Sequence, residues 1–350
     1  MKILKTILKI LGIFLGLLVI IYLLGPRPKK VDFSKLRAVT YSSDLQQLEN
    51  SINAKESELP VKKDNQARIV WATPYAKTPY SMVYLHGNGA SQEEGDPIHE
   101  ALAHRYGCNL YLARLKGHGL IVEDPMLNLD AGQWMQSALD AIEVGKAIGE
   151  KVILVSCSTG STLGLYLEAK YPGLVAAHIM FSPNIDIYDP RSFILDGPWG
   201  LQLSRKIAGG NSYSWTASAT AQQYWYTSYR IEGLVTLKSM IDATMTEATF
   251  KAINDPVFMA YYYFDEDHQD KTVSVIRMRE MYNELSTPPS EKMDVPLKNA
   301  GTHMIASDIF NDNLNALWTP LTAYCEKVLK LPIADTTDYF MYLDLRPKTE

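Results

Sequence analysis

The chain has 350 residues, of which 47% are hydrophobic and 21% charged, and its formal net charge is -5. This length suits one large domain with an insertion, and the acidic balance argues against a nucleic-acid-binding protein, which needs a basic surface. The three cysteines are too few and too irregularly spaced for a disulfide framework, and without a CxxC spacing they do not indicate a zinc site.

An apolar segment at the N-terminus, residues 1–29, is expected to anchor the chain in a membrane. Residues 10–25 carry no charge. As a helix they would span about 24 Å, and the lysines before them can extend the span by reaching the membrane interface. A cleaved signal peptide is the alternative, but no A-x-A-like cleavage site follows the apolar run. Basic residues flank both sides, so they indicate the membrane side only weakly, with an extracytoplasmic domain favoured.

After a polar stretch, strand and helix signals alternate along the chain. Residues 30–65 are predicted to be a linker with a short helical segment. Apolar and aromatic runs predict strands, and longer stretches with helical periodicity predict helices. The alternation implies right-handed crossovers and an α/β fold with a mostly parallel sheet between helices. The predicted strands are 68–72, 81–85, 109–113, 151–155, 177–181, 257–263 and 294–298, and the predicted helices are 130–149, 159–170 and 311–329.

One stretch interrupts this alternation. Residues 186–255 lack strand patterning and are rich in Trp, Tyr, Ala, Ser and Thr, so they are predicted to form a mostly helical insertion. The core would then comprise residues 66–185 and 256–332. A tail over residues 333–350 would complete the chain.

The strongest indication of chemistry is the sequence SCSTG at 156–160, between a predicted strand and a predicted helix. This context is typical of a nucleophile elbow, in which a serine lies on a tight turn between the two elements. Ser158 is then the candidate nucleophile. Gly160 provides one of the two small neighbours that the turn requires, and Ser156 stands where glycine is usual. An ordinary helix cap rich in serine and threonine is the alternative interpretation.

Two further motifs follow predicted strands. HGNG at 86–89 follows the second strand, where the N–H of Asn88 could form an oxyanion hole together with the N–H of Thr159. His303 lies in a loop after the last short strand, from which it could act as a general base. The other histidines considered are expected to be structural, namely His86, His118, His178 and His268.

The acidic partner of His303 has more than one candidate. The run DEDHQD at 265–270 follows the strand predicted over 257–263. A charged run of this kind is usually a solvated loop, and only one carboxylate has to face the histidine. From the residues alone, Asp265 and Asp270 both remain candidates.

Together these segments resemble the α/β-hydrolase superfamily, in its esterase and monoacylglycerol-lipase-like branch, over about residues 66–330. The order of nucleophile, acid and histidine in that family implies Ser158, Asp270 and His303 as catalytic residues. Asp270 is preferred to Asp265 because DKTVS at 270–274 matches the stretch that follows the family's acid. The family's lid corresponds to residues 186–255. The matching segments are HGNG at 86–89, RLKGHG at 114–119, SCSTG at 156–160, DKTVS at 270–274 and GTH at 301–303.

The resemblance implies a membrane-anchored serine hydrolase that cleaves carboxylic esters and needs neither a metal ion nor an organic cofactor. Aromatic residues in the insertion suggest an apolar pocket, which suits a lipid-derived acyl ester presented by a nearby membrane. A serine peptidase or amidase on the same fold is one alternative, and a catalytically silent binding protein is another. The aromatic residues are Trp199, Tyr213, Trp215, Tyr224, Trp225, Tyr226 and Tyr229.

Overall fold

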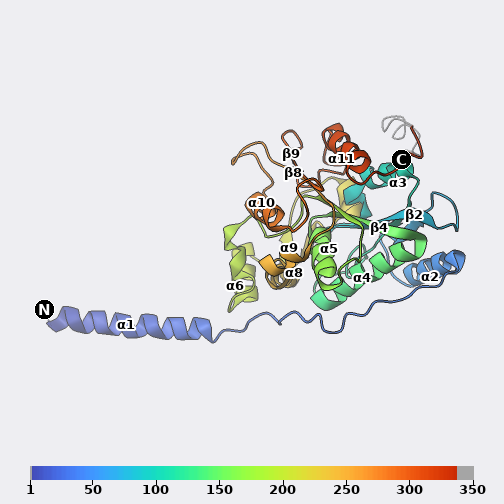
Figure 1. The fold of residues 1–350 in the computed structure, drawn as a ribbon. Coiled ribbons are helices and arrows are strands. Elements are labelled where there is room, and N and C mark those ends of the chain that lie inside the picture. The colour runs from blue at the N-terminus through green and yellow to red at the C-terminus, as the bar shows by residue number, and fades with distance from the viewer. Residues whose placement is uncertain (1, 337–350) are drawn as a thin grey trace.

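The main sheet of the computed structural model has seven strands in the order β1-β3-β2-β4-β5-β8-β9 (Figure 1). All neighbouring strands pair in parallel except β1, which is antiparallel to β3. The structure describes residues 2–336, so most of the predicted tail lies outside the described residues. The strands are β1 (Arg68–Val70), β2 (Thr78–Leu85), β3 (Asn109–Leu112), β4 (Gly149–Cys157), β5 (Ala177–Phe181), β8 (Val257–Tyr262) and β9 (Lys292–Leu297). The predicted mostly parallel sheet is confirmed.

Two apolar cores lie on opposite faces of this sheet, because successive side chains of a strand point to opposite faces. In β4, Leu154 packs in one core, whereas Ile153 and Val155 pack in the other. The first core also contains side chains from α4 (Ala131–Ile148), α5 (Thr159–Lys170), α8 (Ile231–Thr244) and α10 (Val275–Glu284). The second contains side chains from α3 (Ile98–Tyr106) and α11 (Asn315–Lys327).

The ends of α4 and α5 agree with local sequence signals, whereas those of α11 do not. Asp130 caps α4, because its carboxylate accepts a hydrogen bond from the N–H of Gln133 at 3.0 Å. Helix α5 has the predicted bounds. Helix α11 begins later than predicted, at Asn315, and continues through Pro320.

The insertion between β5 and β8 contains strands that the sequence did not predict. Its helices are α6 (Gly200–Ala208), α7 (Ala219–Tyr224), α8 and α9 (Glu247–Ala252), with a short 3₁₀ helix η2 (Pro190–Ile194). Strands β6 (Ser212–Ser214) and β7 (Ser228–Arg230) form an antiparallel pair. The helices agree with the prediction of a mostly helical insertion, and the short strand pair adds to it. Strands this short and rich in serine show no alternation of apolar residues, which is the signal that predicts strands.

The N-terminal part of the chain extends away from this domain. Helix α1 (Lys2–Leu23) projects outward, and an extended linker joins it to α2 (Leu45–Ser57) (Figure 1). The short 3₁₀ helix η1 (Gln92–Gly95) lies farther along the chain, between β2 and α3. Residues Ile3–Leu23 have a mean hydropathy of 2.5, and none of them is buried. By length and composition this helix could cross a membrane or serve as a signal sequence.

Candidate active site

Ser158 occupies the turn that joins β4 to α5. Its backbone has φ 51° and ψ -120°, a conformation that residues other than glycine rarely adopt. Its N–H donates to the carbonyl of Phe181 at 2.9 Å, and its own carbonyl accepts from the N–H of Asn184 at 3.0 Å. These bonds hold the strained turn. A serine on a sharp turn from strand to helix is the geometry of a nucleophile elbow.

The two small neighbours of Ser158 fit the turn in different ways. A Cβ atom on Gly160 would lie 2.0 Å from the carbonyl oxygen of Leu85, so the start of α5 leaves no room for a larger residue. Ser156 is fully buried, and its Oγ shares a hydrogen bond of 2.9 Å with Oγ of Ser161. This bond accommodates a serine where glycine is usual, because the buried hydroxyl has a partner.

His303 and Asp270 form a close pair on loops that follow β9 and β8. Nδ1 of His303 lies 2.6 Å from Oδ2 of Asp270. The other oxygen, Oδ1, accepts from the N–H groups of Thr272 at 2.8 Å and Val273 at 3.2 Å. Both oxygens of the buried carboxylate are therefore fixed.

Asp265, the alternative acid, has a different partner. Its carboxylate lies 2.8 Å from Nδ1 of His268, on a side chain that is 48% exposed. Of the two aspartates that the sequence left open, the fold thus brings Asp270, and not Asp265, to His303.

The surroundings of His303 change its affinity for a proton. Burial alone lowers the pKa of the imidazole, because it disfavours the charged form. The charge of Asp270, the hydrogen bond to it and the charge of Glu94 act in the opposite direction and raise the pKa of His303 above its ordinary value. The ring is therefore a stronger base than a free imidazole.

Glu94 is a second buried carboxylate at this site, and no sequence motif indicated it. Its Oε2 accepts a hydrogen bond of 2.5 Å from the N–H of Gly87. A Cβ atom on Gly87 would lie 2.9 Å from Oε1 of Glu94 and 2.8 Å from Cβ of Ser158, so the carboxylate lies close behind the nucleophile. Burial raises the pKa of Glu94, and the charge of His303 and the Gly87 hydrogen bond partly offset this effect.

Ser182, directly after β5, is another residue that sequence reasoning missed. Its backbone has φ 44°, and its Oγ donates to the carbonyl of His303 at 2.8 Å. Its own N–H donates to the carbonyl of Ala260 at 2.7 Å. Ser182 thus ties the histidine loop to the ends of two central strands. Both residues lie at the site because segments far apart in the sequence meet there, which local patterns do not reveal.

Asn88 follows β2 and faces the insertion. Neither its backbone N–H nor that of Thr159 has a hydrogen-bond acceptor within residues 2–336, so both are available to a ligand. Among the described residues, the buried Oδ1 of Asn88 has no hydrogen-bond partner, and Oγ1 of Thr159 accepts from Asn184 at 3.3 Å. Two free N–H groups near a nucleophile can stabilise a developing oxyanion.

The insertion closes over this site. The N–H of Tyr226 donates to the carbonyl of Gly89 at 2.7 Å. Trp225 belongs to an apolar cluster that also contains Met304, next to His303. The insertion therefore rests on both the HGNG loop and the histidine loop, and Ser158 is only 5% exposed.

The aromatic residues of the insertion do not all gather at the site. Four of them are buried between the insertion and the core: Tyr224, Trp225, Tyr226 and Tyr229. Trp215 is partly buried against the same cluster as Trp225. Tyr213 is 44% exposed, and Trp199 packs against the end of α1. An apolar acyl pocket among these residues stays a prediction.

The histidines expected to be structural have structural surroundings. Nε2 of His86 accepts from the N–H of Leu115 at 3.1 Å, and its Nδ1 lies 2.9 Å from the carbonyl of Gly87. The ring of His118 lies 5.0 Å from both His86 and Trp134. His178 is buried in β5, and His268 pairs with Asp265.

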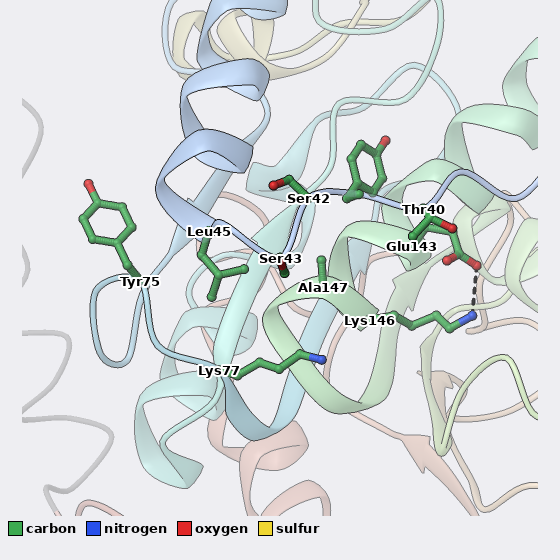
Figure 2. Close-up of a pocket in the computed structure, with 10 residues that line it drawn as sticks. Thr40, Ser42, Ser43, Leu45, Tyr75, Lys77, Glu143, Lys146 and Ala147 are labelled. Atoms are coloured by element: carbon green, nitrogen blue, oxygen red, sulfur yellow. Dashed lines mark hydrogen bonds and ion pairs between the residues drawn. The ribbon is translucent and has the colours of Figure 1, made fainter.

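A surface hollow of about 440 Å³ lies elsewhere, between the linker, the start of α2 and α4 (Figure 2). Figure 2 shows Lys146 paired with Glu143 on its wall, at 3.0 Å. None of the ten residues that line it belongs to the site around Ser158. This hollow is therefore separate from the candidate active site.

No protein-family model matches the chain, and no curated protein matches it by sequence. Solved structures do match. A structure of LipS and LipT, two metagenome-derived lipolytic enzymes, aligns with a TM-score of 0.60 and 15% identity, covering 76% of this chain and 99% of the other. The monoacylglycerol lipase of Paleococcus ferrophilus aligns with a TM-score of 0.53 and 15% identity, covering 74% and 98%.

A third similar structure is Est1E from Butyrivibrio proteoclasticus with bound ferulic acid. It aligns with a TM-score of 0.51 and 13% identity, covering 76% of this chain and 95% of the other. At such low identities these similarities concern the fold. They show that the chain has the α/β-hydrolase fold, as the sequence motifs implied.

Proposed function

We propose that the protein is a serine hydrolase that cleaves carboxylic esters, with Ser158 as nucleophile. One observation carries this proposal: the strained turn at Ser158 and the 2.6 Å pair of His303 and Asp270 both follow carboxyl ends of strands in one parallel sheet. A nucleophile, a base and a residue that orients the base are the parts of a catalytic triad.

In the proposed first step, Oγ of Ser158 attacks the ester carbonyl carbon while Nε2 of His303 takes the hydroxyl proton. Asp270 keeps a proton on Nδ1 and stabilises the imidazolium that forms. The N–H groups of Asn88 and Thr159 donate to the oxyanion of the tetrahedral intermediate. When the intermediate collapses, the ester C–O bond breaks, and His303 protonates the departing alcohol.

The acyl group is then bound to Ser158 as an ester. His303 removes a proton from a water molecule, and the water oxygen attacks the acyl carbon. Collapse of the second tetrahedral intermediate releases the carboxylic acid and returns the proton to Oγ of Ser158. Every proton movement in this cycle is assigned to His303, whose raised pKa suits a base.

An apolar, lipid-derived acyl ester is the proposed substrate class. The insertion covers the site with buried aromatic side chains, including Trp225 and Tyr229, which favour an acyl chain over a polar group. Lipolytic enzymes among the similar structures support the same class.

We further propose that α1 is retained as a membrane anchor. A removed signal peptide would have no lasting contact with the domain, whereas the end of α1 bonds to the insertion. The indole N–H of Trp199 donates to the carbonyl of Ile21 at 3.1 Å, and the N–H of Trp199 donates to the carbonyl of Pro26 at 2.7 Å. These contacts favour an uncleaved chain.

Turnover of aryl esters of increasing acyl length, and of matching anilides, tests the proposal. We expect the intact protein to hydrolyse the esters and Ser158→Ala to lose the activity, while Ser192→Ala, on the surface of the insertion, keeps it. Preferential cleavage of the anilides would identify an amidase instead. A folded protein that cleaves neither series would be a silent binding protein.

A further inference from the structure

The end of α1 is held against the insertion by a turn at residues 197–200. A Cβ atom on Gly25 would lie 2.0 Å from Nε1 of Trp199, so the indole rests directly on the backbone where the helix ends. Trp199 itself has φ 60°, an unfavourable conformation for a side chain of this size. Its hydrogen bonds to Ile21 and Pro26 help to maintain that conformation.

An exposed apolar surface lies next to this contact. Phe193 is 65% exposed, Leu203 is 38% exposed and Ile207 is 60% exposed. Leu203 and Ile207 are four residues apart in α6 and therefore share one face of the helix. We call these three residues the lid-tip surface.

Exposed cationic side chains lie in α6 itself and in the linker that follows α1. They are Lys206 in α6 and Arg27, Lys29 and Lys30 in the linker, and Lys29 lies 3.8 Å from Asp130. Exposed apolar residues bordered by lysine and arginine are typical of protein surfaces that lie in a membrane interface. Anionic headgroups would meet these cations.

The direction of α1 fixes where a membrane would be. In Figure 1, α1 points away from the domain, and the folded domain lies beyond the C-terminal end of the helix. If the apolar stretch Ile3–Leu23 spans a bilayer, its C-terminal end lies at the lipid–water boundary. The turn that holds this end leads directly into α6, so the lid-tip surface is brought to the same boundary.

We propose that the lid-tip surface is embedded in the interface of a bilayer that contains anionic lipids, with the insertion held there by the contact of Trp199 with the end of α1. The proposal rests on α1 as an anchor and not on the chemistry of Ser158. It places the part of the chain that covers the active site at the surface from which a lipid ester would enter.

The test uses the full chain in vesicles of phosphatidylcholine and phosphatidylglycerol, with a fluorophore on one cysteine and quenchers on the lipid chains. Ile207→Cys reports on the lid-tip surface, Ile13→Cys on the anchor, and Ile333→Cys is a control that is also exposed, at 44%. The native cysteines are all buried and compete little for the label.

We expect quenching at position 207 to be weaker than at position 13 and at least about twofold stronger than at position 333. The reason is that interfacial helices lie roughly 5–10 Å into the bilayer boundary. We also expect it to decrease in vesicles of phosphatidylcholine alone. Strong quenching at 13 with quenching at 207 equal to that at 333 would overturn the proposal and leave the anchor intact. Quenching at 13 no greater than at 333 would overturn both. If the fluorophore at position 207 escapes quenching only at high protein concentration, a second copy of the chain covers the lid-tip surface, and the proposal is overturned.

Discussion

Replacing Asp270 by asparagine should remove most of the activity while preserving the fold. Oδ1 of Asp270 accepts two backbone N–H groups, from Thr272 and Val273. The asparagine carbonyl must therefore take the Oδ1 position, which turns its NH₂ group toward His303. An NH₂ donor favours the tautomer in which Nδ1 is unprotonated. Nε2 of His303 then carries the proton and cannot accept one from Ser158.

The expected loss of kcat can be estimated from this change of the His303 tautomer. A wrong histidine tautomer in a serine triad lowers kcat by about 10⁴-fold, which corresponds to about 5.4 kcal/mol of transition-state stabilisation. The remaining activity should also respond differently to pH. Because Asp270 raises the pKa of His303, its removal lowers that pKa, and the acidic limb of kcat/KM moves to lower pH.

The assay is kcat and kcat/KM for a short aryl ester across pH, with a thermal melt of each variant as a check of folding. Asp265→Asn and Asp267→Asn are matched controls from the same loop. Asp265 pairs with His268 on the surface, so we expect these two variants to differ little from the intact protein. A larger loss in Asp265→Asn than in Asp270→Asn would show that Asp265, and not Asp270, is the acid that acts on His303.

Two further substitutions test buried carboxylates, one beside His303 and one in α5. Glu94→Gln keeps an acceptor for the N–H of Gly87 but removes a charge that raises the pKa of His303. We expect the acidic limb of kcat/KM to move to lower pH, whereas Glu93→Gln should leave it in place; an unchanged limb in Glu94→Gln would show that its charge does not act on His303. Burial and the neighbouring Asp255 raise the pKa of Glu168 to about 7. Since a raised carboxyl pKa stabilises the native state only while the proton is bound, stability should fall as pH rises through that range. Asp255→Asn, which can donate to an ionised Glu168, should flatten the change in melting temperature between about pH 5 and about pH 8; an unaltered slope would contradict this assignment.

The sequence predicted the parts of the fold that depend on local signals. The apolar run of β5 and the stop of α5 before Tyr171 and Pro172 are visible in the sequence, and both elements have their predicted bounds. Strands β6 and β7 have three residues each and no apolar alternation, so only their pairing across the insertion defines them.

The site was predictable to the extent that its residues belong to motifs. Ser158 and His303 lie in short segments with a recognisable order along the chain. Glu94 lies in a run of polar residues that suggests an exposed surface, yet it is 3% exposed because the HGNG loop and Cys157 enclose it. Burial of this kind depends on packing between distant segments, which a local pattern does not contain.

The most direct test of the proposed mechanism is the site of covalent labelling by a fluorophosphonate, located by mass spectrometry of the digested protein. The proposed mechanism predicts one adduct for each chain, on the peptide that contains Ser158, and no adduct in Ser158→Ala. It also predicts that His303→Ala labels much more slowly, because the base is absent. Stoichiometric labelling of a different serine, or labelling of Ser158→Ala at the rate of the intact protein, would contradict it.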